Sequence, residues 1–360
     1  MRVALDGTPL LGARTGIGTY VAHLVDGLAA TPGLDVVATP FTGRAGVPDD
    51  LPSTVAWRSS RVPARVLRAA WMRADVPSAE LLCGRHDVFH GTNFVLPPTR
   101  GAGVVTVHDL TYERFPELVA PASRQYRTLV PRGLRRARRV LVPSRTVARE
   151  VVETYDVRAD RVDVTPLGVA PVWSQARPLP EARLESLGVR GPYSVFVGTR
   201  EPRKNLATVV AAQRLHEQRG GSGSLVLVGA SGWHDVAQTP GTVVMPHLPG
   251  EDVRGLVAGA RALLMPSLYE GFGLPVLEGM AAGVPVVCSD VPVLREVAGE
   301  HARFVAATDV DAWADVLAAA VDGPPGPAHA LQAARAHAAT FTWERCAAAT
   351  VAAYRRAVEA

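Results

Sequence analysis

The stretch Glu270-Gly-Phe-Gly-Leu-Pro-Val-Leu-Glu278 follows the apolar run Ala262–Met265. The run predicts a buried strand, and Pro275 is typical of the first turn of a helix. Between the two, Gly271 and Gly273 allow the backbone to come close to a ligand. A strand that leads through a glycine turn into a helix is the unit from which parallel α/β sheets are built.

The helix start in this stretch is a predicted anion site. The first amides of a helix have no partner within it, and its dipole favours negative charge there. Glu270 precedes the turn and Glu278 lies one turn inside the helix, so both carboxylates could accept hydrogen bonds from the hydroxyls of a sugar or ribose. A plain glycine-rich turn with two solvated glutamates is the alternative. The amides expected at the anion are those of Phe272, Gly273 and Leu274.

Short β-branched runs alternate with amphipathic, helix-length stretches along the whole chain. This pattern predicts an α/β fold of two doubly wound, Rossmann-like domains, with the ligand at the carboxyl ends of the strands. The proline-rich stretch 166–192 is the predicted linker, which gives domains 1–170 and 171–342. The sequence leaves open whether the last helix, within 343–360, packs back on the first domain. The predicted strands are Val3–Leu5, Val36–Ala38, Val88–His90, Val104–Val107, Val140–Val142, Val162–Val164, Ser194–Val197, Leu225–Val228, Val243–Met245, Ala262–Met265, Val286–Cys288 and Phe304–Val305.

Composition limits the possible classes of protein. The chain has 360 residues, of which 48% are hydrophobic, and this excludes a disordered or fibrous protein. Three dispersed cysteines give no disulfide framework, and no stretch approaches 18 apolar residues, so a cytoplasmic location is expected. A net charge of +4 is too small to indicate nucleic acid. Residues 1–180 carry 23 Arg against 16 acidic residues, whereas 181–360 carry 15 basic against 18 acidic residues.

The segment Gly198-Thr-Arg-Glu-Pro-Arg-Lys-Asn205 lies where another predicted strand leads into a helix. Arg203 and Lys204 there could neutralise a diphosphate at the strand ends. Lys204 is the single lysine in a chain with 37 arginines, although arginine can replace lysine at most surface positions. A solvated basic turn is the alternative, and a helix start disfavours it because the dipole there attracts anions.

Together the two segments resemble the retaining, metal-independent glycosyltransferases of family 4, which have the GT-B fold, and the resemblance covers essentially the whole chain. It implies that Glu270 holds hydroxyls of the donor sugar and Glu278 the ribose, and that Arg203 and Lys204 bind the nucleotide diphosphate. The segment Val244-Met-Pro-His-Leu248 corresponds to the stretch whose backbone reads the nucleobase, here at His247 and Leu248. Pro246 departs from the glycine usual there.

The resemblance also gives roles to residues of the first half. Gly16 and Gly18 form a predicted glycine-rich turn after the first strand, which would line the donor phosphates or the acceptor, and an ordinary tight turn is the alternative. His108 follows a predicted strand directly. A histidine there is often structural, but the resemblance implies that His108 lies near the reacting centre of the sugar and is catalytic, together with Glu270.

No metal site is expected. Asp309-Val-Asp311 matches a DxD pattern, but it begins a predicted helix, where Asp is a favoured cap. Two arginine-rich stretches of the first half, Arg124–Arg149 and Trp57–Arg73, carry interleaved apolar residues. They predict either contact with an anionic membrane, such as the inner face of the plasma membrane, or a solvated basic surface.

The resemblance therefore implies a two-domain glycosyltransferase that moves a hexose, best matched by mannose from GDP-mannose, to a glycan or lipid-linked acceptor without a metal or other cofactor. The acceptor would bind the first half and the donor the second. Two alternatives remain at this point. One is a GT-B enzyme of another class, a nucleotide-sugar epimerase or a sugar phosphorylase, and the other is a non-catalytic nucleotide-sugar-binding protein.

Overall fold

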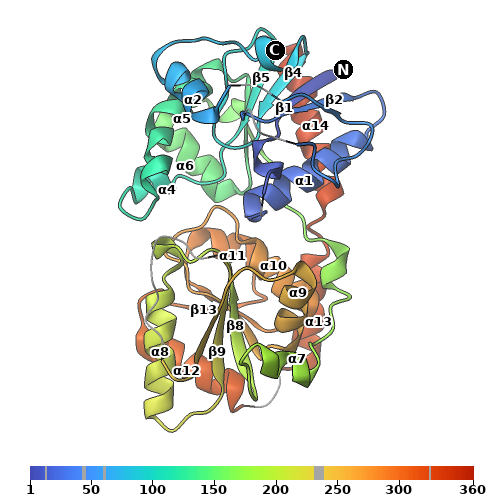
Figure 1. Cartoon of the computed structure of the whole chain (residues 1–360). Helices are drawn as coiled ribbons and strands as arrows, with labels where there is room; N and C mark the ends of the chain where they lie inside the picture. Colours follow the sequence, from blue (N-terminus) through green and yellow to red (C-terminus); the bar gives the residue numbers. More distant parts are fainter. Residues whose placement is uncertain (13, 43–45, 60–61, 231–238, 324–325) are drawn as a thin grey trace. The chain divides into compact units, whose positions relative to one another are not determined.

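A computed structural model describes residues 1–12, 14–42, 46–59, 62–230, 239–323 and 326–360 of the chain. The chain forms two compact units (Figure 1). Unit 1 comprises residues 1–116, 120–168 and 343–360, and unit 2 comprises residues 117–119 and 169–342. The C-terminal helix α14 (Trp343–Glu359) therefore belongs to unit 1.

Unit 1 is built on a parallel sheet of seven strands in the order β3-β2-β1-β4-β5-β6-β7. The outward order from β1 in both directions is that of a doubly wound fold. Most of the strands are continuous apolar runs because helices cover both faces of the sheet. The strands are β1 (Arg2–Asp6), β2 (Asp35–Thr39), β3 (Ala56–Trp57), β4 (Val88–Gly91), β5 (Ala102–Thr106), β6 (Arg139–Val142) and β7 (Val162–Val164).

The helices of unit 1 lie on both sides of this sheet (Figure 1). Helix α14 packs against α1 and against strands β4, β5 and β6, while α2 packs against α5. The α-helices are α1 (Gly16–Ala29), α2 (Ala64–Arg73), α3 (Glu80–Cys83), α4 (Thr111–Arg114), α5 (Tyr126–Arg136), α6 (Arg145–Tyr155) and α14.

A buried polar network ties α14 to the sheet. The Tyr354 hydroxyl lies 2.7 Å from Nδ1 of His90 on β4, and Nε2 of His90 lies 2.7 Å from Oγ1 of Thr106 on β5. The hydroxyl of Tyr20 on α1 lies 3.0 Å from the same threonine oxygen. Burial lowers the pKa of His90 to about 3, so the ring is neutral. Each of its two nitrogens has a hydrogen-bond partner. The network thus pairs polar groups that the apolar core would otherwise leave unsatisfied.

Unit 2 repeats the plan with six parallel strands in the order β10-β9-β8-β11-β12-β13. Helices α8 and α12 pack together on one side of the sheet, and α9, α10 and α13 lie on the other (Figure 1). The strands are β8 (Tyr193–Val197), β9 (Ser224–Val228), β10 (Thr242–Met245), β11 (Ala262–Met265), β12 (Val286–Ser289) and β13 (Arg303–Val305). The α-helices are α7 (Glu181–Ser186), α8 (Leu206–Gln218), α9 (Gly250–Gly259), α10 (Leu274–Ala282), α11 (Pro292–Ala298), α12 (Val310–Val321) and α13 (Ala328–Ala338).

The predicted α/β fold with two doubly wound sheets is confirmed, and every predicted strand is present. The sequence pattern missed β3, because a strand of two residues is too short to show a pattern. The chain passes from unit 1 to unit 2 between Gly168 and Val169, within the predicted linker 166–192. From Val169 onward this stretch belongs to unit 2, where it forms the short helix Pro171–Trp173 and α7. Pro171 is the first residue of the short helix, where the missing amide hydrogen costs no hydrogen bond, and Pro180 is the N-cap of α7.

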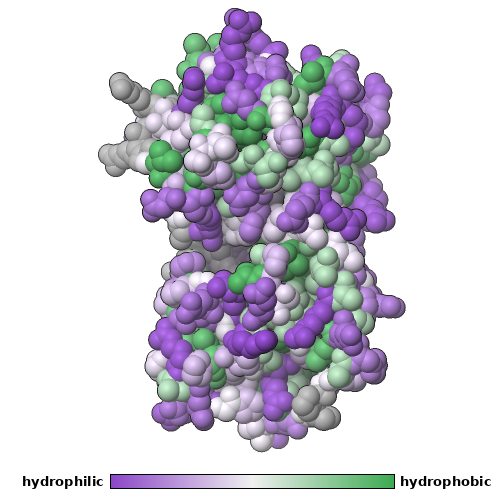
Figure 2. Space-filling view, turned by 90° about the vertical axis from the view of Figure 1, so that its right-hand side faces the viewer, coloured by the Kyte–Doolittle hydropathy of each residue, from purple (hydrophilic) through white to green (hydrophobic). Residues whose placement is uncertain are grey.

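Large apolar side chains fill both units. Trp71, Tyr20 and Phe89 are fully buried in unit 1, as are Trp313 and Phe196 in unit 2. Polar side chains cover most of the face seen in Figure 2, with apolar ones scattered among them. Among the described residues, no helix combines the length and the apolar character that a membrane crossing requires.

Candidate active site

Helix α10 begins as its sequence predicts. Gly273, with φ of 93°, is the N-cap, and Pro275 lies in the first turn. A Cβ at Gly273 would approach Leu294 Cδ2 to 2.8 Å, so a larger residue there would be strained and crowded. Since the first amides of α10 lack acceptors within the helix, the carboxyl edge of this sheet offers hydrogen-bond donors to an anion. The three residues expected to supply them, Phe272, Gly273 and Leu274, are buried.

Glu270 lies just before this turn and forms two ion pairs. Its Oε1 accepts a hydrogen bond from Lys204 Nζ at 2.6 Å, and its Oε2 accepts one from Arg203 Nη1 at 2.9 Å. Glu270 is 5% exposed and Lys204 is 8% exposed. The structure therefore brings together the two segments that the sequence singled out, although 66 residues separate Lys204 from Glu270.

A second carboxylate holds Arg203. Its Nε donates to Glu201 Oε2 at 3.0 Å, and its Nη1 also donates to the Tyr269 carbonyl at 3.2 Å. Two carboxylates and two cations thus form one cluster whose formal charges sum to zero. Lys204 and Glu270 are buried in it, and Glu201 and Arg203 are half-buried. Sequence analysis quoted Glu201 within its motif but gave it no role.

The electrostatics of the cluster keep Glu270 ionised. Burial alone would raise the pKa of Glu270, but Lys204 and Arg203 outweigh it and lower the pKa to about 2. Burial lowers the pKa of Lys204, Arg203 lowers it further, and Glu270 opposes both. We take the pair as ionised at neutral pH, because the ammonium and the carboxylate are in direct contact. The burial cost of Lys204 makes the pair only modestly stabilising as a whole.

Glu278 lies in a different environment on the same helix. It is half-buried on α10, and the structure gives it no cationic partner among the described residues. Burial raises the pKa of Glu278 to about 7, although a hydrogen bond with the Trp173 side chain lowers it in part. Trp173 comes from the stretch that the sequence had assigned to a linker. The two glutamates of the motif are therefore unlike, one fixed as a carboxylate and the other able to gain or lose a proton near neutral pH.

Asn205 is a structural residue of the site that sequence reasoning missed. It adopts φ of 56° at the start of α8, and its Nδ2 donates to the Pro266 carbonyl at 3.1 Å and to the Ala307 carbonyl at 2.7 Å. These bonds join the loop after β8 to the loops after β11 and β13. Asparagine tolerates this left-handed conformation better than other non-glycine residues, and that preference was the available signal.

The predicted base-reading segment follows β10. His247 is exposed and Leu248 is 8% exposed. Arg200, after β8, donates from Nη1 to the carbonyl of Met245, the last residue of β10, at 3.3 Å. Nothing in these contacts tests whether His247 or Leu248 meets a base, so their role stays a prediction.

His108 lies at the carboxyl edge of the other sheet, in unit 1. Its Nε2 lies 2.9 Å from the Thr92 carbonyl, which can only accept, so Nε2 carries the hydrogen in the neutral ring. Burial lowers the pKa of His108, and the rings of Tyr20 and Phe94 pack edge-on against it. Phe94 has φ of 64°, a strained conformation for an aromatic residue. Such strain is often found at functional sites, and here it adjoins His108.

Gly16 and Gly18 do not form a turn, and that prediction is wrong. They are the first and third residues of α1. Gly16 is exposed, and its role toward a ligand stays a prediction. Gly18 has a packing reason to be glycine, because a Cβ there would meet the Pro9 carbonyl oxygen at 2.8 Å.

Several large apolar residues of the arginine-rich stretches are buried, but Val66 on α2 is 50% exposed. Trp71 on α2, with Leu129 and Leu134 on α5, is at most 3% exposed, so these side chains face the core of unit 1 and not a surface. Contact of these stretches with a membrane stays a prediction. Many of the arginines do reach the surface, and Arg61 lies outside the described residues.

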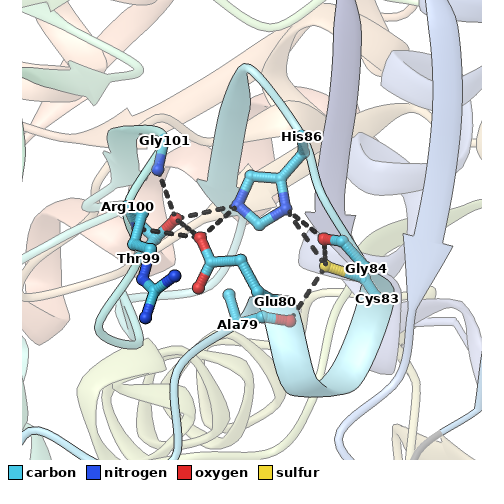
Figure 3. A network of polar contacts seen from close by, with 8 residues as sticks. All are labelled: Ala79, Glu80, Cys83, Gly84, His86, Thr99, Arg100 and Gly101. Atoms are coloured by element: carbon cyan, nitrogen blue, oxygen red, sulfur yellow. Dashed lines mark hydrogen bonds and ion pairs between the residues drawn. The ribbon is translucent and has the colours of Figure 1, made fainter.

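A second polar cluster, at the amino ends of β4 and β5, resembles a catalytic triad (Figure 3). Cys83 Sγ lies 3.4 Å from His86 Nδ1, and His86 Nε2 lies 3.4 Å from Glu80 Oε1. His86 Nδ1 also lies 2.8 Å from the Gly84 carbonyl, which can only accept, so Nδ1 carries a hydrogen and cannot take the thiol proton. Burial raises the pKa of Cys83 to about 11. The cluster therefore fastens α3 to the loop at Thr99 and is not a nucleophilic site.

In the part of the chain that the structure describes, the side chains that could bind a metal ion do not form a site. Within the described ranges, no three His, Cys, Asp or Glu side chains converge as a metal would require. Asp309 of the DxD pattern caps α12, since its carboxylate accepts from the Ala312 amide at 3.0 Å. Its predicted role as a helix cap is confirmed.

Known proteins match this chain over nearly all of its length. A family model described as glycosyltransferase family 4 matches residues 14–173, and one described as glycosyl transferases group 1 matches residues 191–322. The O-antigen chain mannosyltransferase B of Escherichia coli is 30% identical, in an alignment that covers 99% of this chain and all of that protein. The MMP alpha-(1->4)-mannosyltransferase of Mycolicibacterium hassiacum is 30% identical over 78% of this chain and 74% of its own.

Solved structures match the fold of the whole chain. Sucrose-phosphate synthase from Thermosynechococcus elongatus aligns with a TM-score of 0.75 at 20% identity, over 98% of both chains. The Anabaena HepE protein in complex with UDP-glucose aligns with a TM-score of 0.70 at 15% identity, over 99% of this chain and 98% of its own. The two sheets and these matches define a glycosyltransferase of the GT-B fold. The chain belongs to glycosyltransferase family 4, whose members are retaining hexosyltransferases.

Proposed function

We propose that this enzyme transfers mannose from GDP-mannose to a glycan or lipid-linked acceptor. The observation that carries the proposal is Glu270, buried at the start of α10 and held there by Lys204 and Arg203. Mannose is favoured because the relatives just described are named mannosyltransferases. HepE, a neighbour in fold only, was solved in complex with UDP-glucose. UDP-glucose is therefore the alternative donor to test against GDP-mannose.

Departure of the nucleotide diphosphate would leave negative charge at the carboxyl edge of the unit 2 sheet. The amides at the start of α10, together with the basic residues between β8 and α8, would stabilise that charge without a metal. The leaving phosphate could then take the proton of the acceptor hydroxyl on the same face of the sugar. The C–O bond to the diphosphate breaks as the bond to the acceptor oxygen forms, and the configuration is retained.

The two glutamates would hold hydroxyl groups of the donor. Each oxygen of Glu270 accepts one hydrogen bond from a cation and keeps capacity for a sugar hydroxyl. Glu278 would accept from the ribose, which requires its carboxylate form, and its pKa of about 7 predicts that nucleotide binding weakens below neutral pH.

Unit 1 would bind the acceptor in this proposal, with the neutral imidazole of His108 near the reacting carbon. Gly16 is the proposed contact at the N-terminus of α1. The arginine-rich surface of the same unit would attract an anionic membrane by its positive charge.

A thermal-shift screen tests the donor. GDP-mannose, UDP-glucose and UDP-N-acetylglucosamine are added singly, and a donor at 100 times its Kd should stabilise the binding unit by about 2.7 kcal/mol. Stabilisation by UDP-glucose and not by GDP-mannose would overturn the choice of donor. Lys204→Ala should abolish the shift, and an unchanged shift would show that the lysine does not serve the donor.

Product analysis tests the reaction. An epimerase would isomerise the nucleotide sugar with no acceptor present, a phosphorylase would release sugar 1-phosphate, and a non-catalytic binder would do neither. The proposal expects an α-linked mannoside from GDP-mannose by NMR, and turnover that survives EDTA. Loss of turnover in EDTA and its recovery with a divalent cation would overturn the metal-free part.

A further inference from the structure

Three cations lie in the five-residue stretch 200–204 after β8, and their partners differ. Arg203 is held by Glu201, by Glu270 and by the Tyr269 carbonyl. Lys204 is held by Glu270. Arg200 donates one long hydrogen bond to the Met245 carbonyl, and within the described part of the chain it forms no ion pair.

This difference matters because of the charge of the expected ligand. A nucleotide diphosphate sugar carries two negative charges on its phosphates. The cluster of Glu201, Arg203, Lys204 and Glu270 is neutral as a whole, so at a distance it offers such a ligand little net attraction. Its two carboxylates would also repel phosphate oxygens close by. A cation outside the cluster is needed to supply net positive charge.

The position of Arg200 suits that role. Its backbone amide donates to the Ala230 carbonyl just after β9 at 3.2 Å, and its side chain reaches the end of β10. Both points lie at the carboxyl edge of the sheet, the edge at which α10 begins after β11. Arg200 is half-buried, and among the described residues one of its five guanidinium hydrogens has a partner, which leaves four that could meet an anion.

The position of Arg203 suits a different role. Its guanidinium is committed to two carboxylates and one carbonyl, and its side chain is 17% exposed. Releasing it toward a phosphate would leave Glu201 and Glu270 without their shared partner. Arg203 therefore fixes where the oxygens of Glu270 point, and Glu201 in turn fixes Arg203.

We infer that Arg200 binds the diphosphate of the donor, while Arg203, oriented by Glu201, is a positioning residue for Glu270. The inference rests on the proposed function and reassigns one contact that the family resemblance had implied for Arg203.

Calorimetric titration of the full-length enzyme with GDP, UDP and the corresponding monophosphates tests the first half. Arg200→Gln should weaken binding of the preferred diphosphate at least tenfold and make it less sensitive to salt, because charged hydrogen bonds are strong and their attraction is screened. The matched control is Arg190→Gln, which removes the same charge from an exposed position before the amino end of β8 and should change affinity less than twofold.

A pH titration tests the second half. Carbon-13 NMR of the glutamate carboxyl groups follows Glu270, identified by its loss in Glu270→Gln. Arg203→Gln should raise the pKa of Glu270 above its low value, whereas Arg200→Gln should leave it in place. The diphosphate affinity of Arg203→Gln should fall by less than that of Arg200→Gln. If Arg203→Gln does not fold, Arg203→Lys keeps the charge, and its affinity and titration are compared in the same way.

The outcomes separate the inference from the proposed function. Wild-type enzyme that binds no nucleoside diphosphate would overturn both. Wild-type binding that Arg200→Gln leaves intact would overturn the inference alone, as would an equal or larger loss of affinity in Arg203→Gln or an unmoved pKa of Glu270 in that variant.

Discussion

Replacing Lys204 with methionine would remove one end of the buried ion pair and keep the apolar stem of the side chain. The lost contact is the 2.6 Å hydrogen bond from Nζ to Glu270 Oε1, between residues that are 8% and 5% exposed. Breaking a buried pair costs about 3–5 kcal/mol, because the remaining charge is left uncompensated. Glu270 keeps Arg203 at 2.9 Å, so we expect the lower end of that range, about 3 kcal/mol.

The loss should appear in the melting temperature of unit 2. For a unit of this size, 1 kcal/mol corresponds to about 2–4 °C, which predicts a fall of about 6–12 °C in Lys204→Met. Adding Glu270→Gln removes the uncompensated charge, so the double variant should recover at least half of the loss. Circular dichroism followed through the thermal transition measures both. A fall below about 2 °C, or a double variant no more stable than Lys204→Met, would refute the reasoning.

The pH dependence gives an independent check on the cause. The pKa of Glu270 is about 2 in the folded protein against an ordinary value of 4.5. Its ionised form therefore contributes stability that is fully present above pH 4.5 and is lost as the pH falls toward 2. In Lys204→Met the pKa of Glu270 should be higher, because one of its two cations is gone, so the variant can neutralise the buried carboxylate by taking up a proton in mild acid. The difference in unfolding free energy between wild type and variant, measured in urea, should thus be smaller at pH 4 than at pH 7. A difference that grows toward pH 4 would contradict this account.

Three further changes test other parts of the structure. Asn205→Ala should be less stable than Asn205→Gly by about 1 kcal/mol in urea, because both lose the same hydrogen bonds and only alanine is strained at φ of 56°; equal stabilities would count against that strain. As the pH rises from 5 to 8.5, the unfolding free energy of Glu278→Gln should increase relative to that of wild type by about 1–3 kcal/mol. The pKa of Glu278 is raised to about 7, so its ionisation is costly above neutral pH, whereas the neutral acid is tolerated below pH 4.5. A difference in unfolding free energy that does not change with pH would disprove this. Tyr354→Phe should destabilise unit 1 by about 1–3 kcal/mol by thermal unfolding, because it leaves Nδ1 of His90 buried without its 2.7 Å partner; an unchanged melting temperature would mean that the network does not hold α14.

Most of the fold was predictable because its strands are local, apolar and uniform. A parallel sheet covered on both faces requires strands such as Leu225–Val228 to be apolar along their whole length, and that pattern is visible without any partner. The pattern was less informative where structure depends on distant contacts. The proline-rich stretch 166–192 has the composition of a linker, yet Trp173 becomes part of unit 2 because it packs near Glu278.

The candidate site was predictable as a set of residues and not as a set of contacts. Spacing alone indicated that Glu270 precedes a helix start, since glycine and proline mark that boundary locally. It could not indicate that Arg203 contacts Glu270 across 67 positions, nor that Tyr354 reaches His90 across 264. Helix and strand preferences act over a few residues, whereas the partner of a buried charge is chosen by the packing of the whole unit.

In the arginine-rich half of the chain, a count of charges likewise does not show which acid pairs with which arginine. Asp75 accepts from both Arg132 and Arg136, and Asp163 accepts from both Arg139 and Arg356. Each of these acids has two arginines, so every arginine in the two groups is paired and yet each group keeps a net positive charge. The two groups contain Arg132, Arg136 and Arg139 of the 23 arginines in residues 1–180, so they account for only part of the positive charge of that half.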